Sequence, residues 1–180
     1  MRNVGLREVN LQGANLSKAN LRGANLQKVN LSQAILTGAD LQGTGLSECL
    51  LNGADLSGAI LRRAIFRQSN LSGADLTKAD LSGGEEEGGF WHIDIREGVL
   101  DPYDGRYTFR TDLTGAKLSQ AILCEADHRY CDVRDADLTN ADLTGAHLSQ
   151  ALLDGADMRK AKITKQQISM AESAKNIRWD

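Results

Sequence analysis

The chain has 180 residues, of which 41% are hydrophobic and only 4% aromatic, and its formal net charge is −3. This length suits one domain, and 21 basic residues against 24 acidic ones favour neither charge-driven binding of nucleic acid nor binding to a membrane surface. No apolar run approaches the roughly 20 residues that a membrane-spanning helix needs. The low aromatic content indicates many small, similar layers in place of one irregular core.

A large apolar residue recurs at every fifth position from Leu6 to Leu81, sixteen times in succession. Two positions before each of them stands a small residue, and the position between is mostly Asn or Asp. The pattern restarts two residues out of phase at Leu113 and runs to Ile168 for twelve further units. Leu fills 22 of the 28 central positions and Ala fills 19 of the 28 small ones, so the unit is Ala-(Asn/Asp)-Leu-x-x.

A strict period of five matches neither a helix, with its period of 3.6, nor a flat strand, with its period of 2.0. It requires a chain that turns a corner every five residues, so that four units close a square coil. Such coils stack about 4.8 Å apart, and seven of them give a rod of roughly 34 Å. The small and central residues then point inward and form ladders. The predicted core ladder includes Leu16, Leu36, Leu56, Leu76, Ala14, Ala34, Ala54 and Ala74.

This motif resembles that of the pentapeptide-repeat proteins. The resemblance implies an all-β fold, a right-handed quadrilateral β-helix (β-solenoid) of about seven coils. We expect coils one to four over residues 4–82, a non-repeat insertion after coil four over 83–110, and coils five to seven over 111–168. A short C-terminal helical cap is expected over 164–180, overlapping the last turn of the repeat.

The insertion is rich in aromatic and turn-forming residues, and two hypotheses remain open for it. In the first, it folds back onto the side of the rod, where four outward positions are apolar and offer a landing strip. These positions are Ile35, Leu50, Ile60 and Ile65. In the second, Trp91, Tyr103 and Tyr107 form a tip that binds a partner protein.

The two ends of the rod differ in sequence. Thr164 and Gln167 form the Thr-x-x-Gln signature of a capping box, which predicts a helix over the last coil. No equivalent precedes Val4, so we expect an uncapped N-terminal coil, and self-association through this coil is a further hypothesis. Because the repeat begins so close to Met1, we expect no signal peptide and a cytoplasmic location. The alternative is the periplasm or the thylakoid lumen, if a targeting segment has been removed.

The one cluster that suggests chemistry contains Cys124, His128 and Cys131. The repeat places Cys131 inward in an Ala position and Cys124 outward, and no fourth ligand is evident, so we expect no metal site. A disulfide between Cys124 and Cys131 would need a local bulge. The simpler interpretation is a distorted coil with a buried thiol and a hydrogen-bonded His128.

The sequence contains no glycine-rich phosphate loop, Ser-His-Asp set or HExxH motif, and a leucine-filled rod has no room for a ligand pocket. We therefore expect no enzyme and no cofactor, but a scaffold or protein-interaction module whose partner is another protein. The resemblance adds an alternative, because some members of the family mimic duplex DNA and bind DNA gyrase. A net charge of −3 is a poor match to the roughly 20 phosphates of DNA of this length.

Overall fold

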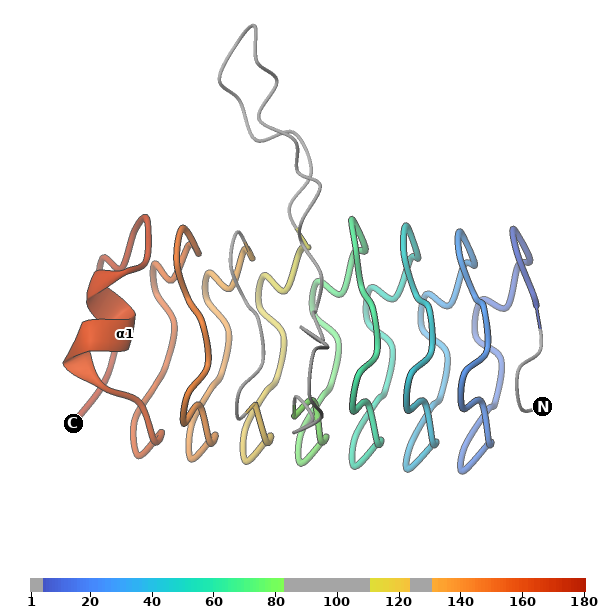
Figure 1. Cartoon of the computed structure of the whole chain (residues 1–180), viewed down its shortest axis with the longest axis horizontal. Coiled ribbons are helices and arrows are strands. Elements are labelled where there is room, and N and C mark those ends of the chain that lie inside the picture. The colour runs from blue at the N-terminus through green and yellow to red at the C-terminus, as the bar shows by residue number, and fades with distance from the viewer. Residues whose placement is uncertain (1–4, 83–110, 124–130) are drawn as a thin grey trace, which may run out of the picture.

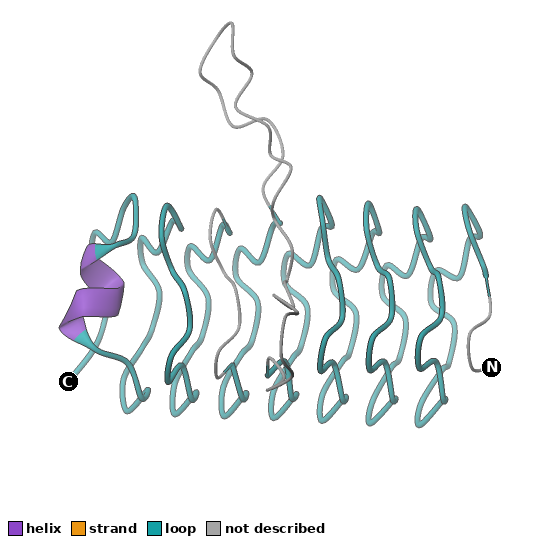
Figure 2. Ribbon diagram, in the orientation of Figure 1, coloured by secondary structure: helices purple, strands orange, loops and turns teal. Residues whose placement is uncertain are grey.

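The structure, a computed structural model, describes residues 5–82, 111–123 and 131–180. The chain forms a rod of stacked coils, with the first coil (blue) and helix α1 (red) at opposite ends (Figure 1). Helix α1 spans Lys165–Ser169 and is the only helix in these three segments. Within the same segments the sheet consists of isolated bridges without longer strands, which is why Figure 2 draws nearly the whole rod as loop.

Within residues 5–82, parallel bridges join residues that are 20 apart in the chain. Asn10 pairs with Asn30, and Asn30 pairs in turn with Leu50. At each bridge the backbone bonds run both ways, since the Leu11 N–H donates to the Asn30 carbonyl at 2.7 Å and the Asn30 N–H donates to the Val9 carbonyl at 3.0 Å. Four such ladders run along the rod, one for each five-residue unit of a coil. The spacing of the motif therefore becomes a stack of coils in register.

A tight turn closes each five-residue unit. The Ala14 N–H donates to the Leu11 carbonyl at 3.0 Å, and the residue before Ala14 has a positive φ, as a type II turn requires at its third position. Gly13, with φ +67°, adopts this conformation freely. Lys18 adopts it with φ +55°, at a cost of about 1–2 kcal/mol for a residue with a side chain. The corner thus tolerates polar residues as well as Gly.

The Asn or Asp before each Leu has a structural task at this corner. Asn15 Oδ1 accepts the backbone N–H of Ser17 at 3.1 Å, and Asp55 Oδ1 accepts that of Ser57 at 2.9 Å. This is the Asx turn, in which a short polar side chain bonds the backbone two residues ahead. Both residue types serve equally, because each offers the same oxygen acceptor.

The inward residues form one continuous core along the rod. In the first coil Leu16 and Ala14 remain partly exposed. The other members of the predicted core ladder have no exposed surface; they are Leu36, Leu56, Leu76, Ala34, Ala54 and Ala74.

The ladders carry on past the break in the repeat. Asn70 pairs with Asp112 and Asp80 with Ile122, a separation of 42 residues in place of 20. The chain therefore holds 42 − 20 = 22 residues more than one coil needs at this point. The range 83–110, with the fold-back and partner-tip hypotheses attached to it, lies outside the described residues, and both remain predictions.

The C-terminal end combines a helix with further coil backbone. Helix α1 has five residues and begins after Thr164, which forms the expected capping box with Gln167. Beyond the helix, Ser173 bridges to Leu152 and Arg178 bridges to Asp157. The helix thus covers only part of the range 164–180 that we expected to be a helical cap, because the residues after it return to the ladder.

Candidate functional site

Leucine side chains fill the interior of the rod. A cavity of about 10 Å³ lies inside the rod and is lined by leucines and one valine, among them Leu113, Leu138 and Leu153. A space of this size holds at most about one water molecule, and an apolar lining keeps it dry. This cavity is therefore too small to bind a substrate or a cofactor.

The core nevertheless holds polar residues in small positions, which the motif did not predict; Cys49 and Thr111 belong to one stack of small positions and Thr44 to another. The Thr44 hydroxyl donates to the Leu21 carbonyl at 2.8 Å, and the Thr111 hydroxyl donates to the Phe66 carbonyl at 2.7 Å. The Cys49 thiol lies 2.9 Å from the Leu26 carbonyl oxygen. Each group bonds the carbonyl of a central residue one coil earlier, so these positions tie neighbouring coils together from inside.

Burial raises the pKa of the Cys49 thiol to about 11, although backbone hydrogen bonds near Val29 and Lys28 oppose this shift. The thiol therefore stays protonated at neutral pH and is not a nucleophile. Cys131 is also fully buried, in its predicted inward position. Cys124 and His128 lie outside the described residues, so the disulfide and the hydrogen-bonded His128 remain predictions.

On the outside of the rod, one ladder carries acidic and basic side chains in alternation, with more acidic than basic ones. We call this ladder the acidic face. It consists, in stacking order, of Asn15, Ile35, Asp55, Asp75, Lys117, Asp137, Asp157 and Arg178. Pairs of carboxylates alternate with single cations along it, and the Lys117 Nζ lies 3.5 Å from Asp75 Oδ2. The Arg178 Nη1 lies 3.7 Å from Asp157 Oδ2. The face is a row of regularly spaced charges of both signs.

Hydrogen bonds favour the ionised form of Asp55, Asp75 and Asp157 on this face. Partial burial alone would raise the pKa of Asp75, but hydrogen bonds from Thr77 and the charge of Lys117 outweigh it and leave that pKa below its usual value. Asp55 behaves in the same way through Ser57 and Thr37. An oxygen already engaged in an Asx turn is poorly placed for proton transfer. The paired carboxylates therefore give no support to acid–base catalysis.

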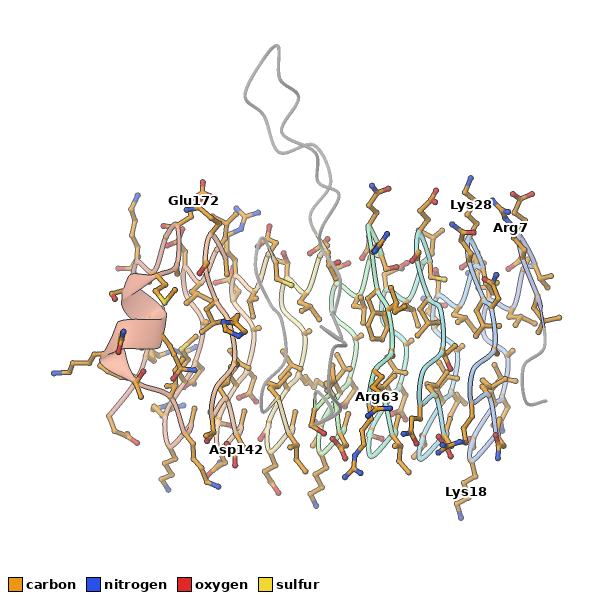
Figure 3. All side chains as sticks on the ribbon, in the orientation of Figure 1. Arg7, Lys18, Lys28, Arg63, Asp142 and Glu172 are labelled. Atoms are coloured by element: carbon orange, nitrogen blue, oxygen red, sulfur yellow. The ribbon has the colours of Figure 1, made fainter. Side chains whose placement is uncertain are left out.

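Hydroxyl groups form a column beside the acidic face, at the next corner of the coil. Thr37 Oγ1 donates to Asp55 Oδ2 at 2.9 Å, and Thr139 Oγ1 lies 3.1 Å from Ser119 Oγ. Charged side chains project from the corners themselves. Figure 3 shows Arg7 and Lys28 on one edge of the rod and Lys18 on the opposite edge.

The apolar landing strip proposed for the insertion does not form. Its four residues belong to four different ladders, because each stacks on different neighbours. Ile35 stacks between Asn15 and Asp55, whereas Leu50 stacks between Asn30 and Asn70. The interpretation was wrong because it used position in the repeat without the face on which each unit lies.

Residues 5–82, 111–123 and 131–180 contain no group of three or more His, Cys, Asp or Glu residues arranged to hold a metal ion. None of their helices is long and apolar enough to cross a membrane.

The comparison with protein families rests on the repeat itself. The model for pentapeptide repeats matches residues 6–43, 46–83, 109–145 and 131–165, with eight copies. These matches span well over half of the chain. The chain belongs to the pentapeptide-repeat family. The predicted resemblance is thereby confirmed, and the stacked coils are those of a pentapeptide-repeat β-helix. No curated protein sequence matches the chain.

Solved structures of the same family are similar to this chain at low identity. A trypsin-treated form of QnrB1, a plasmid-mediated fluoroquinolone resistance protein, is 17% identical over 99% of this chain and 91% of that one, with a TM-score of 0.45. HetL of Nostoc sp. strain PCC 7120, a protein involved in heterocyst differentiation regulation, is 27% identical over 99% and 86%, with a TM-score of 0.28. A pentapeptide-repeat protein of the Arabidopsis thaliana thylakoid lumen is 21% identical over 89% and 72%, with a TM-score of 0.30.

Proposed function

We propose that this protein is a non-enzymatic scaffold, a right-handed quadrilateral β-helix of about seven coils with an insertion after the fourth, which binds another protein through its outer faces. The observation that carries the proposal is the leucine-filled interior, whose cavity of about 10 Å³ cannot accept a substrate or a cofactor. The oxygens engaged in Asx turns and the protonated Cys49 also supply no catalytic pair.

The acidic face is the surface that we propose for the partner. Its side chains repeat at the coil spacing of about 4.8 Å, which matches the rise between strands of a sheet and the pitch of any partner built from stacked coils. Because carboxylates and cations alternate along it, a partner with the reversed order of charges gains specificity more than affinity. The mixed signs also argue against binding to nucleic acid.

A capture experiment with charge-neutralised variants tests this proposal. The purified chain is used to capture proteins from its native host, together with a double variant, Asp75→Asn and Asp137→Asn. Asn retains the Asx turn, so the coils are preserved while two charges are removed. The matched control is Asp40→Asn with Asp80→Asn, which removes two charges from another ladder. We expect the partner to be lost with the first pair alone. Equal capture by both variants would contradict the role of the acidic face.

The insertion can be tested separately, because the register defines how much to remove. Deleting residues 85–106 takes out the 22 surplus residues and restores a separation of 20 between the ladders on either side. The shortened chain should keep the rod and, if the faces bind, the partner as well. Loss of the partner on this deletion would transfer the binding site to the insertion.

The alternative is a DNA mimic that binds DNA gyrase, as the family resemblance implies for some members. The acidic face is interrupted by Lys117 and Arg178, and Arg159 is paired with its Asp157. These cations weaken any imitation of an unbroken row of phosphates. Inhibition of gyrase supercoiling by the purified protein would support the alternative. Supercoiling that continues unchanged at high protein concentration would exclude it.

A further inference from the structure

One face of the rod carries no charged side chain along residues 5–82. We call it the uncharged face; it comprises the outward positions of the ladder that contains Asn10 and of the turn that follows each unit of this ladder. Its residues are Asn10, Gln12, Gly13, Asn30, Ser32, Gln33, Leu50, Asn52, Gly53, Asn70, Ser72 and Gly73. Each of the other three ladders, taken with its turns, carries charged side chains over the same coils, for example Glu8, Asp55 and Arg62.

The absence of charge on this face ends with the fourth coil. In the coils that follow, the same columns hold Asp112, Asp132, Arg134, Asp135 and Asp154. The Asx turn does not require the difference, since Asn30 and Asp132 use the same side-chain oxygen to accept a backbone N–H. Charged residues are depleted at the centres of protein–protein interfaces, so the uncharged face has the composition of a contact surface.

Leu50 stands in the middle of the uncharged face. Its side chain is 47% exposed, and it lies between Asn30 and Asn70 on the ladder. The repeat has no need of a leucine at this outward position, where Asn or Asp closes an Asx turn. Gly53 and Gly73 lie at the corner beside this ladder and keep the surface low there. A partner can therefore cover Leu50 without removing a charge from water.

The amide groups of this ladder offer hydrogen bonds to a partner. Asn30 and Asn70 accept backbone N–H groups through Oδ1, at 3.0 and 2.9 Å. Their Nδ2 groups donate to no residue in the described part of the chain. The partner that fits must supply acceptors and an apolar contact but no charge, and a second copy of the uncharged face supplies both.

A row of alternating charges borders the uncharged face on the side of the preceding turns. It consists of Glu8, Lys28, Glu48 and Gln68, one from each coil, along the edge on which Figure 3 labels Lys28. Lys28 Nζ lies 3.5 Å from Glu48 Oε2. If a second copy lies face to face and antiparallel, with the two-fold axis between the coils of Lys28 and Glu48, each Lys28 meets the Glu48 of the other copy. Each Glu8 then meets a Gln68, which can donate to it.

The same two-fold axis matches the rest of the face. Asn10 lies opposite Asn70, and the long side chain of Gln33 lies opposite Gly53, where there is room for it. The two Leu50 side chains lie on either side of the axis, about one coil spacing of 4.8 Å apart along the rod, and pack against each other. Such a contact uses the same surface on both copies and closes at two.

One like-charged pair opposes this arrangement at its margin. Arg7 would face the Arg67 of the other copy, one residue further from the contact than the charged row. Arg7 Nε lies 3.7 Å from Glu8 Oε1 within its own chain, and this neighbouring carboxylate offsets its charge. The repulsion therefore falls on the exposed rim, where single charges contribute little.

We propose that two copies of this chain form an antiparallel, side-by-side dimer through the uncharged face. The contact covers one side of four coils, about 19 Å along the rod, which is less than the roughly 800 Å² per partner of a standard interface. The dimer therefore forms at high concentration only. It does not depend on the function proposed above; the acidic face lies one corner further round each coil, so both acidic faces stay exposed on the same side of the dimer.

Sedimentation equilibrium and small-angle X-ray scattering of the full chain test the dimer. We expect a mass of 19.5 kDa at low concentration that rises towards twice this value at up to about 1 mM, as a small interface requires. The maximum dimension of the dimer should exceed that of one rod and remain below that of two, because the rods overlap over four coils. A monomer at every concentration, or a dimer as long as two rods, would overturn the proposal.

Leu50→Asp places two carboxylates across the axis. Asp is an ordinary residue at this position of the repeat, as Asp55 shows, so the variant should fold. The dissociation constant of the dimer should rise about tenfold or more, because like charges meet in the contact. Ile60→Asp is the matched control, since Ile60 is 40% exposed on the opposite face of the rod, and it should dimerise like the unmodified chain. An equal effect of both variants would overturn the proposal.

Mixing two single variants tests the orientation. Lys28→Glu and Glu48→Lys each place like charges opposite each other in their own dimer, so each variant alone should dimerise less than the unmodified chain. Both positions have a positive φ that Glu8 and Lys18 also adopt, so the exchange keeps the turn. An equimolar mixture should restore dimerisation, because every charge then meets its opposite. A mixture that dimerises no better than the separate variants would exclude the antiparallel arrangement.

Discussion

The backbone N–H of Cys49 donates to the hydroxyl oxygen of Ser69, 3.1 Å away on the next coil, and Ser69 donates in turn to the carbonyl of Leu46. In most other units the corresponding N–H bonds directly to the carbonyl three residues earlier, as Ala24 does with Leu21 at 3.0 Å. At Cys49 the hydroxyl stands between the two groups and bridges them. One side chain thus completes a turn that belongs to another coil.

Removal of this bridge should destabilise the rod. In Ser69→Ala the buried Cys49 N–H loses its acceptor and the Leu46 carbonyl loses its donor, unless the turn closes to re-form the direct bond. An unsatisfied buried group costs about 1–3 kcal/mol, and closure of the turn would bring the cost to the lower end of that range. Urea denaturation followed by circular dichroism measures the change.

Thr44→Val is the matched comparison. Thr44 also donates to a carbonyl of the previous coil, that of Leu21, but this carbonyl already accepts the Ala24 N–H. Its removal should therefore cost less than the loss of Ser69, about 0.5–1.5 kcal/mol. A larger loss for Thr44→Val than for Ser69→Ala would contradict the bridging role of Ser69.

Truncation of a central leucine should lower the free energy of unfolding more in the middle of the rod than at its N-terminal end. Leu56 is fully buried between coils on both sides, and Leu56→Ala should lower the free energy of unfolding by about 2–5 kcal/mol because the neighbouring coils cannot collapse into the gap. Leu16 lies on the same face in the first coil, where it is partly exposed. Equal losses in denaturant titrations of Leu56→Ala and Leu16→Ala would show that the first coil is covered.

The interior of the rod was predictable because it depends on single repeats. A corner every fifth residue, with Leu and Ala inward, follows from spacing and side-chain size alone, and the complete burial of Leu36 and Ala34 agrees with it. The Asx turns are local as well, since Asn15 bonds a group only two residues away.

The contacts between coils were not predictable from the repeat in the same way. Ser69 meets Cys49 only because 20 residues separate stacked positions, and Thr111 meets Phe66 only because the break adds 22 more. The same information was missing when Ile35 and Leu50 were assigned to one strip. A hydroxyl in a small position signals such a contact, because a buried Ser or Thr needs a partner.

The C-terminal helix should depend on Gln167 more than on any other residue of its sequence. The Gln167 side chain accepts the Thr164 N–H at 2.9 Å and donates to the Leu143 and Ala146 carbonyls. Gln167→Ala should therefore increase hydrogen exchange in α1 and lower the free energy of unfolding by about 1–3 kcal/mol. Gln166→Ala, at an exposed neighbouring position, should change neither measurement. An effect of equal size in both variants would contradict the anchoring role of Gln167.

Acid should weaken the end of the acidic face through Asp157. The Arg159 guanidinium binds both oxygens of this carboxylate, with Nε–Oδ1 at 2.9 Å and Nη2–Oδ2 at 2.6 Å, and lowers the pKa of Asp157 to about 2. An unfolded Asp has a pKa of about 3.9. Because the folded value is the lower one, the stabilisation is complete above about pH 4 and is lost as the pH falls from there towards about 2.

In Arg159→Gln the pKa of Asp157 should return towards that of an unfolded Asp, which NMR titration of the carboxyl carbon can follow. The variant should be less stable than the unmodified chain at neutral pH, and this difference should shrink as the pH approaches about 2. Lys160→Gln is the control, since Gln occupies the same corner conformation at Gln33 and Gln120. A stability difference between Arg159→Gln and the unmodified chain that stays constant from pH 7 to pH 2 would mean that Arg159 acts by packing, without a contribution from its bond to Asp157.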